Sequence, residues 1–308
     1  MAAPMPRIGV LLSVFNGEAY LPAQLDSILA QDYQNLIIIL RDDGSTDASR
    51  EIVSRYIASH SPRMVLMPDD GRRLGACGSF AALMEFALTQ KPLLGLSPAY
   101  LAFSDQDDVW DPDHLSTGMS AMLEQESRVA SPVLVHSDLR VVDAHLVELA
   151  PSLIAYQGLQ PWRMNFGRVL VANAVTGCTM LINESLARLA LPIPPQAIMH
   201  DWWIAVMARL QGETRFLPRA TVSYRQHGAN ALGARQRVQA GSAGELVRRA
   251  LTRHQDGDFS ALAGQSCALL ASRGELLDWR TRAIARLALG MDRGGLAARV
   301  VYRLVRLL

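Results

Sequence analysis

The chain has 308 residues, half of them apolar, and a formal net charge of +1, which is the composition of a folded globular protein rather than of a disordered or collagen-like chain. Lys91 is the only lysine, and no Gly-Lys-Ser or Gly-Lys-Thr is present, which excludes a P-loop nucleotidase. The charge is unevenly distributed, because residues 233–308 hold thirteen arginines and six acids, which leaves the preceding part of the chain acidic.

Cysteine usage and hydropathy bear on the compartment. Cys77, Cys178 and Cys267 are far apart and form no CxxC pair, so we expect buried, reduced thiols. The N-terminal residues lack the pattern of a signal peptide. The longest uncharged stretch, Val169–Asn183, has 15 residues, whereas a membrane-spanning helix needs roughly 20. We therefore expect a cytoplasmic chain without a membrane span.

The first part of the chain alternates predicted strands and helices. Four short apolar runs predict strands that are buried on both faces. They are Ile8–Val14, Leu36–Leu40, Met64–Met67 and Tyr100–Ser104. Apolar residues at helical spacing follow each run, within Leu21–Leu29, Ile52–Ile57, Phe80–Thr89 and Leu115–Leu123. Repeated βα units of this length predict a mostly parallel sheet with helices on both faces.

The second part is less regular. Its predicted elements are strands at Val133–His136 and Arg140–Val142, a loop and strand within Asn173–Ile182, a helix at Asp201–Leu210 and a pair of strands within Arg215–Tyr224. From Ser242 onward only a helical pattern remains. We predict one α/β domain over residues 1–232 and a basic helical extension over residues 233–308.

Two acidic clusters follow predicted strands directly. Asp42 and Asp43 follow the second strand, and Asp105, Asp107 and Asp108 follow the fourth. Ligands of open parallel sheets bind at the carboxyl ends of the strands, and carboxylates that converge there repel one another unless a cation or a donor-rich ligand joins them. The alternative is that these aspartates are turn formers and helix N-caps. The ligand spacing of an EF-hand is absent.

Five segments in order resemble a known family. They are Val14–Gly17 (VFNG), Asp42–Asp47 (DDGSTD), Ser104–Trp110 (SDQDDVW), His200–Trp203 (HDWW) and Tyr224–Gly228 (YRQHG). Together they resemble family 2 glycosyltransferases with the GT-A fold, and the last two are similar to the bacterial rhamnosyltransferase branch. The resemblance covers residues 7–232. It implies a Rossmann-like GT-A sheet flanked by helices, with a nucleotide-sugar half over about 7–125 and an acceptor half over about 126–232.

The resemblance implies a metal site for Mn²⁺ or Mg²⁺. Asp107 would be the direct ligand, Asp105 would contact the donor ribose or the water molecules of the metal, and His227 would be a late ligand that closes over the phosphates. A divalent cation stabilises the diphosphate that leaves during glycosyl transfer, and hard oxygen ligands suit these two metals. The alternative for His227 is an exposed histidine at a strand end.

The resemblance also implies nucleotide contacts. Asp43 would accept a hydrogen bond from the N3–H group of uracil or thymine, and Asn16 would lie near the base or its ribose. The glycine-rich junction Leu74–Ser79 permits close approach of a nucleotide, although it could equally be an ordinary loop.

The reaction further needs a general base for the acceptor hydroxyl. Asp201 is the candidate, and a single displacement that it assists would invert the anomeric carbon. The alternative is that Asp201 is the N-cap of its helix. Trp202 or Trp203 could stack on a sugar, but tryptophans on a helix are more often part of the core.

The combined expectation is an inverting, metal-dependent transferase that moves L-rhamnose from dTDP-β-L-rhamnose to a lipid-linked or cell-surface polysaccharide acceptor. Other UDP- or dTDP-hexose donors remain an alternative. A sugar nucleotidyltransferase would carry a basic, glycine-rich loop where this chain has Phe15–Glu18. A degenerate carbohydrate-binding module is disfavoured by the joint retention of Asp43, Asp107, Asp201 and His227. The acidic site argues against nucleic-acid binding.

The C-terminal segment predicts a basic amphipathic helix. Arg299, Arg303 and Arg306 share one helical face. An adjoining apolar stripe is formed by Leu296, Val300, Leu304 and Leu307, and it is widened by Val301, Val305 and Leu308. Such a helix can lie in the headgroup region of an anionic membrane, which predicts a peripheral position at the inner face of the cytoplasmic membrane. The alternative is a helix that packs its apolar face on the catalytic domain.

Overall fold

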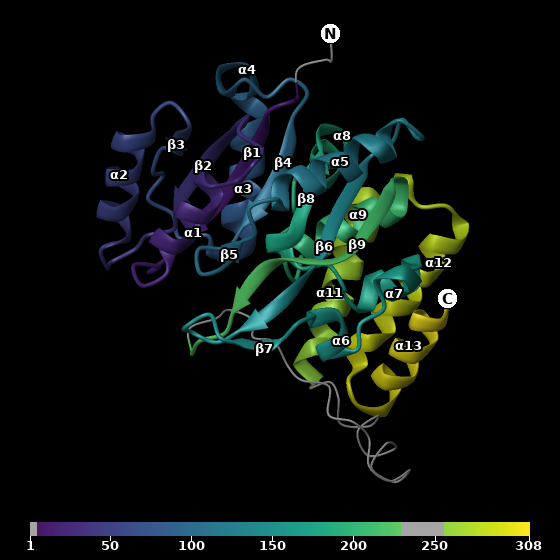
Figure 1. Ribbon diagram of the computed structural model, residues 1–308. Coiled ribbons are helices and arrows are strands. Elements are labelled where there is room, and N and C mark those ends of the chain that lie inside the picture. Colours follow the sequence, from purple (N-terminus) through teal and green to yellow (C-terminus); the bar gives the residue numbers. More distant parts are fainter. Residues whose placement is uncertain (1–4, 229–255) are drawn as a thin grey trace.

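The protein is an α/β structure with a curled central sheet and helices on both of its faces (Figure 1), seen in a computed structural model that describes residues 5–228 and 256–308. The strands are β1 (Ile8–Val14), β2 (Leu36–Asp42), β3 (Met64–Leu66), β4 (Tyr100–Ser104), β5 (Val109–Trp110), β6 (Val133–Val142), β7 (Glu148–Ala150), β8 (Met180–Asn183) and β9 (Glu213–Arg225). The helices are α1 (Leu21–Leu29), α2 (Ser49–His60), α3 (Gly75–Thr89), α4 (Lys91–Leu94), α5 (His114–Glu126), α6 (Leu153–Gln157), α7 (Phe166–Val171), α8 (Glu184–Ala190), α9 (His200–Gln211), α11 (Asp256–Arg273), α12 (Trp279–Ala288) and α13 (Gly295–Leu307).

The first half of the sheet is parallel, as the βα pattern predicts. The strands lie in the order β3, β2, β1, β4, and each neighbouring pair is parallel. Burial explains the continuous apolar runs, because alternate residues of these strands face two different cores. Ile37 and Ile39 pack toward α3, whereas Ile38 and Leu40 pack with residues of α1 and α2.

The second half of the sheet is mixed, which limits the prediction of a mostly parallel sheet to the first half. Strand β8 is antiparallel to both β4 and β6, β6 is parallel to β9, and β5 and β7 pair antiparallel with β9 and β6. The two strands predicted at Val133–His136 and Arg140–Val142 form the single strand β6.

The strand pair predicted within Arg215–Tyr224 is wrong, because this segment belongs to the one long strand β9. Its pairing with β6 shifts register between Leu217 and Ala220. Pro218 lies at this shift, where a residue without an N–H group does not interrupt the ladder. The irregularity is therefore a bulge and not a strand end.

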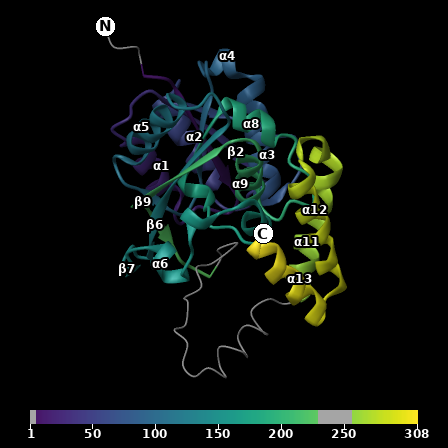
Figure 2. The same cartoon turned by 90° about the vertical axis from the view of Figure 1, so that its right-hand side faces the viewer.

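The C-terminal helices pack against the sheet domain, and Figure 2 shows them stacked along one side of it. Phe259, Leu269, Met291 and Val305 join the same apolar core as α3, α7 and α9. The contact of α13 with α7 is close, because a Cβ atom at Gly167 would lie 2.1 Å from the carbonyl oxygen of Val305. Residues 229–255, where the predicted extension begins, lie outside the described residues.

The fold bears on the expected absence of a membrane span and on the expected burial of the cysteines. Among the helices of the described residues, none combines the length and apolarity that crossing a membrane requires. The expectation of buried thiols is confirmed for Cys178 but is wrong for Cys267, which is exposed on α11, and Cys77 is partly buried. The exposed thiol lies one position from the buried Ser266 and Ala268, on the solvent side of this helix.

Candidate functional site

A cavity opens at the carboxyl ends of the parallel strands. In the sheet register Val14 lies beside Asp42 and Leu12 beside Ser104, so the loops after β1, β2 and β4 meet at one edge. The cavity has a volume of about 300 Å³ and includes Asp43, Asp105, Asp107 and Asp201 in its walls. The predicted convergence is confirmed for Asp43, Asp105 and Asp107, whereas Asp42 accepts the N–H groups of Gly44 and Ser45, as the turn-former alternative predicts.

Asp43 is a buried carboxylate that the glycine-rich junction holds in place. It accepts hydrogen bonds from the backbone N–H groups of Leu74 and Gly75, both at 2.7 Å, and pairs with the guanidinium of Arg41. Burial acts to raise the pKa of Asp43, but these hydrogen bonds lower it below its usual value, so the group is ionised at neutral pH. Gly75 and Ala76 stand beside it in the cavity wall.

Asp107, in the loop after β4, and His227, just after β9, are in contact. The Oδ2 atom of Asp107 lies 2.8 Å from Nε2 of His227, whose ring packs on Tyr20 with 4.6 Å between centroids. The His227 side chain is 12% exposed. The alternative of an exposed strand-end histidine is therefore wrong.

The Asp107–His227 pair fits a divalent cation. Two ligands in adjacent octahedral positions, each about 2.1 Å from the metal, are about 3 Å apart, and the observed separation is 2.8 Å. The carboxylate oxygen suits Mn²⁺ or Mg²⁺, and the imidazole nitrogen favours Mn²⁺ of these two. Asp105 lies in the same cavity, where burial and the charges of Asp107 and Asp201 raise its pKa to about 7.

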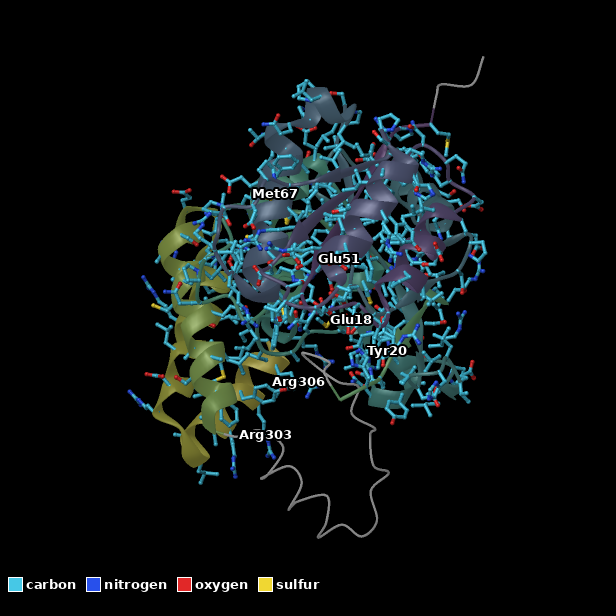
Figure 3. All side chains as sticks on the ribbon, turned by 90° about the vertical axis from the view of Figure 1, so that its left-hand side faces the viewer. Glu18, Tyr20, Glu51, Met67, Arg303 and Arg306 are labelled. Atoms are coloured by element: carbon cyan, nitrogen blue, oxygen red, sulfur yellow. The ribbon has the colours of Figure 1, made fainter. Side chains whose placement is uncertain are left out.

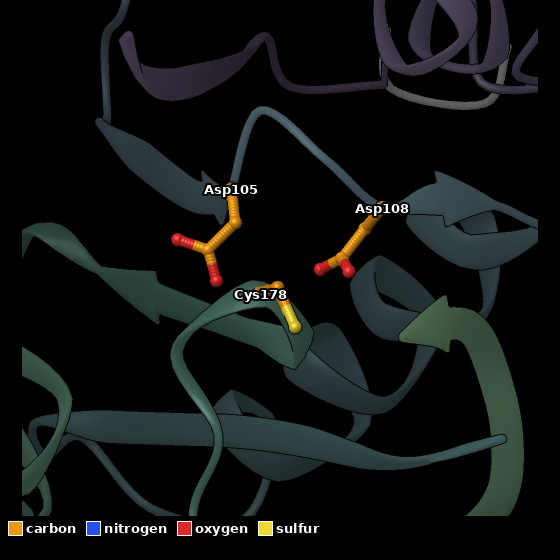
Figure 4. A group of neighbouring side chains, drawn as sticks. All are labelled: Asp105, Asp108 and Cys178. Atoms are coloured by element: carbon orange, nitrogen blue, oxygen red, sulfur yellow. The ribbon is translucent and has the colours of Figure 1, made fainter. Parts of the chain in front are cut away.

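A second group of ligand-type side chains lies beneath the cavity. Figure 4 shows Asp105, Asp108 and Cys178 turned toward one another, with one ligand atom of each within 4.8 Å of the others. Burial, together with the charges of Asp108 and Asp105, raises the pKa of the Cys178 thiol well above its usual value. The group offers one thiol and two carboxylates, and a soft thiol ligand suits Zn²⁺ better than Mn²⁺ or Mg²⁺. Asp108 is fully buried and accepts the backbone N–H of Arg225 at 3.1 Å, as expected of a supporting group.

Asp201 is the second residue of α9 and faces the cavity. The N-cap of this helix is Met199, so the alternative of Asp201 as the N-cap is wrong. Its Oδ2 atom accepts the backbone N–H of Gly177 at 3.0 Å. Burial raises the pKa of Asp201 to about 7, although the hydrogen bonds from Trp202 and Gly177 oppose this shift. A carboxylate with this pKa can accept a proton near neutral pH.

The two tryptophans of α9 belong to the core. Trp203 is fully buried, and its Nε1 donates to the carbonyl oxygen of Ala190 at 2.9 Å. The Nε1 atom of Trp202 donates to the carbonyl oxygen of Val169. Neither ring is among the residues that line the cavity, so the core interpretation is confirmed and the stacking interpretation is not supported.

Asn16 lies at the surface, beside the cavity rather than in its wall. Its backbone has a φ of +48°, and its side-chain oxygen accepts the N–H of Thr46 at 2.8 Å. This bond joins the loop after β1 to the loop after β2. The predicted contact of Asn16 with the base or ribose stays a prediction.

The sequence analysis assigned no role to several residues that line the cavity. The guanidinium of Arg73 lies 3.8 Å above the ring of Phe15, and both side chains line the cavity. Gln106 accepts the N–H of Phe15 at 2.8 Å and donates to its carbonyl oxygen at 2.9 Å. Gln106 could have been noticed inside the acidic motif, whereas nothing in the sequence marks Arg73.

The sequence was compared with known families and curated proteins. The family model described as "Glycosyl transferase family 2" matches residues 10–189. The chain is 25% identical over 231 residues to the dTDP-rhamnosyl transferase RfbG of Shigella flexneri, a match that covers 72% of this chain and 74% of the relative. It is 27% identical over 117 residues to the UDP-Glc:alpha-D-GlcNAc-diphosphoundecaprenol beta-1,3-glucosyltransferase WfgD of Escherichia coli, covering 38% of this chain and 41% of the relative.

Solved glycosyltransferases share the fold. S. aureus TarS in complex with UDP-GlcNAc aligns with a TM-score of 0.56 at 14% identity, over 98% of this chain and 90% of that chain. GalNAc-T7 with UDP, GalNAc and Mn²⁺ aligns with a TM-score of 0.50 at 13% identity, over 72% of this chain and 44% of that chain. These likenesses establish the GT-A architecture, and the family match covers more than half of the sequence. The chain belongs to glycosyl transferase family 2 and is a glycosyltransferase.

Proposed function

We propose that this glycosyltransferase is an inverting, metal-dependent enzyme that transfers L-rhamnose from dTDP-β-L-rhamnose to a lipid-linked or cell-surface polysaccharide acceptor. The observation that carries the proposal is the meeting of Asp43, Asp107 and Asp201 around one cavity. The similarity to a protein named as a dTDP-rhamnosyl transferase supports the donor. The similarity to a glucosyltransferase named for a diphosphoundecaprenol substrate supports a lipid-linked acceptor.

The nucleotide half of the donor binds beside Asp43. This carboxylate is ionised and fixed by Arg41 and by two backbone N–H groups, so it can accept the N3–H of thymine or uracil without rearranging. Arg73 and Phe15 offer a cation and an aromatic face on the same wall. Asn16 contributes by ordering the loop that carries Phe15.

The diphosphate binds beside Asp107 and His227. A Mn²⁺ or Mg²⁺ ion bound there supplies the positive charge that stabilises the departing diphosphate. The His227 ring is already oriented by its packing on Tyr20. Arg225, the last residue of β9, places its guanidinium 4.6 Å from the centre of the same Tyr20 ring. Asp105, in the same cavity, orients the ribose or the water molecules around the cation.

Asp201 removes the proton from the acceptor hydroxyl. The hydrogen bond from the Gly177 N–H fixes the direction of the carboxylate, and its pKa of about 7 makes it a stronger base than an exposed aspartate. The hydroxyl then attacks the anomeric carbon on the face opposite the diphosphate, so the configuration of that carbon inverts.

A donor screen tests the proposal. We expect nucleotide release with Mn²⁺ to be at least about tenfold faster with dTDP-L-rhamnose than with UDP-hexoses or CDP-sugars, because the sugar pocket selects the transferred group and cytosine lacks the N3–H that Asp43 accepts. The matched control is Asp201→Asn protein. Equal rates with a UDP-hexose would contradict the rhamnose donor but keep the glycosyltransferase, and release from CDP-sugars alone would contradict the role of Asp43.

We further propose that α13 docks on an anionic membrane surface. The predicted apolar face of this helix is divided. Val305 is fully buried and packs at Gly167 of α7, so the predicted packing on the catalytic domain occurs in part. The other side chains of the predicted stripe, Leu296, Val300, Leu304 and Leu307, are 47–76% exposed. Arg303 and Arg306 are exposed beside it and lie at the lower end of the molecule in Figure 3.

The basic surface continues beyond α13. Trp162 is 66% exposed and lines an open hollow together with Arg163, Arg168 and Arg209. This hollow adjoins α7, on which α13 packs. Exposed leucines, a tryptophan and arginines on neighbouring helices are the composition of a surface that binds in the headgroup region.

Substitution of the stripe tests membrane docking. We expect replacement of Leu296, Val300, Leu304 and Leu307 by Gln to reduce co-sedimentation with phosphatidylglycerol vesicles at least about tenfold, because the buried apolar area is lost, while nucleotide release in solution stays unchanged. The control is Leu93→Gln, since Leu93 is 85% exposed on α4. Point changes are preferable to truncation, because α13 also fills the core. Unchanged vesicle binding of the quadruple variant, or no binding of the intact protein at low salt, would refute docking.

A further inference from the structure

The side chain of His200 forms a wall of the cavity next to the proposed base. It is 4% exposed and lines the same cavity as Asp201. Its ring stacks on Phe80, with 4.1 Å between centroids and 27° between planes, and on Phe103, with 5.5 Å and 24°. The imidazole is therefore held in one orientation.

Both ring nitrogens of His200 lack a hydrogen-bond partner among the described residues. Burial lowers the pKa of His200 to about 3, so the ring is neutral and offers one N–H donor and one acceptor nitrogen. Buried polar atoms are nearly always hydrogen-bonded in folded proteins. A partner from outside the chain is the simplest way to satisfy them.

Gly177 lies against one edge of the His200 ring. A Cβ atom at Gly177 would lie 3.0 Å from Nε2 of His200, and the same glycine donates its N–H to Asp201. Gly177, itself part of the cavity wall, therefore adjoins both the imidazole and the proposed base.

The position of His200 indicates a contact with the transferred sugar of the donor rather than with the acceptor. Phe103 lies on β4, two residues before Asp105, and Phe80 lies on α3, whose first residue Gly75 donates to Asp43. His200 thus rests on the elements that carry the proposed donor contacts. Because its ring is almost entirely buried, it belongs to the deep part of the cavity, which the donor fills first.

We propose that His200 is a specificity-determining residue whose neutral imidazole hydrogen-bonds one hydroxyl of the transferred sugar. The ionised carboxylates nearby can only accept hydrogen bonds, so they take the protons of sugar hydroxyls. The imidazole N–H donates to a hydroxyl oxygen, which no ionised carboxylate can do. This inference rests on the proposed function only in naming dTDP-L-rhamnose as the donor.

Combining His200 variants with donors that lack one sugar hydroxyl tests the inference. We expect His200→Phe, which keeps an aromatic ring between Phe80 and Phe103, to lower kcat/KM for dTDP-L-rhamnose about 10-fold to 100-fold and to leave dTDP affinity unchanged. The 2-, 3- and 4-deoxy donors are then compared. For one of them the wild type and His200→Phe should have equal kcat/KM, because the hydroxyl that His200 binds is absent. His200→Gln, which retains a donor and an acceptor, should recover part of the loss with the normal donor.

Controls separate this inference from the proposed function. His114→Phe replaces a buried histidine that bonds Thr221 and does not line the cavity, and it should show equal losses with all donors. If the wild type does not use dTDP-L-rhamnose, the proposed donor fails, and the comparison is run with deoxy forms of the donor that the screen identifies. If His200→Phe loses activity equally with every deoxy donor, or lowers dTDP affinity to the same extent, His200 does not contact the sugar.

Discussion

We expect Asp201→Asn to reduce glycosyl transfer by roughly 10² to 10⁴-fold, which is the usual contribution of a general base, with donor affinity within a few-fold of the wild type. The amide keeps the shape of the side chain and can still accept the N–H of Gly177, but it cannot take a proton. The measurement is transfer rate under saturating donor, together with a titration of donor binding. If donor binding collapsed while turnover per bound donor stayed normal, Asp201 would be a structural residue.

The pH profile gives the same assignment a second test. Burial raises the pKa of Asp201 to about 7, so the carboxyl is protonated below that pH and cannot act as a base. We expect the transfer rate to fall about tenfold per pH unit below pH 7. Asp105 has a pKa near the same value, so the wild-type profile is compared with that of Asp201→Asn. The residual activity of Asp201→Asn should lack the acidic limb that belongs to Asp201.

Replacement of the proposed metal ligand should have an effect of similar size. We expect Asp107→Ala to lower turnover about a thousandfold, since a cation at the diphosphate contributes several kcal/mol of charge stabilisation, and to weaken Mn²⁺ binding measured by titration. The melting temperature should stay close to that of the wild type, because the Asp107 side chain contacts the cavity and not the core. Chelation of the wild type should abolish turnover, and Mn²⁺ or Mg²⁺ should restore it.

Cys178→Ala is the matched control for the metal site. If Asp107 and His227 hold the cation, this variant keeps Mn²⁺ affinity and metal-dependent turnover, because Cys178 belongs to the other group of ligand-type side chains, with Asp105 and Asp108. If Cys178→Ala loses Mn²⁺ and Asp107→Ala does not, the assignment is reversed. Full turnover of the wild type in chelator would refute metal dependence altogether.

The first half of the fold could be predicted closely because its strands are continuous apolar runs. Ile8–Val14 and Tyr100–Ser104 have the same bounds in sequence and structure, since both faces of these strands are covered by helices. In the second half the pairing partner decides where a strand ends. The sequence predicts two strands within Arg215–Tyr224, but the long partner strand β6 accommodates the irregularity at Pro218 as a bulge.

The candidate site likewise contains residues that the sequence predicts and residues that it does not. Asp43, Asp105 and Asp107 could be predicted because they follow strands whose ends must meet at one edge of the sheet. The location of His227 beside Asp107 could be anticipated only from the family motif, because it depends on how β9 returns across the sheet. Arg73 and Gly177 enter the cavity from loops, and the path of a loop is set by tertiary contacts that no local pattern records.

The packing of α13 connects it, through side-chain contacts with α7, to the helix that carries Asp201. Val305 of α13 contacts α7 at Gly167, and Val169 of α7 accepts the Trp202 Nε1–H bond from α9, which is the helix that carries Asp201. No flexible connection lies between these contacts. If α13 docks on a membrane as we propose, these packed side chains fix the height of Asp201 above that surface, so an acceptor held there must present its hydroxyl at a set distance. A side chain at Gly167 would meet the carbonyl oxygen of Val305, which lies 2.1 Å from a Cβ atom there, and would change that distance by displacing α13.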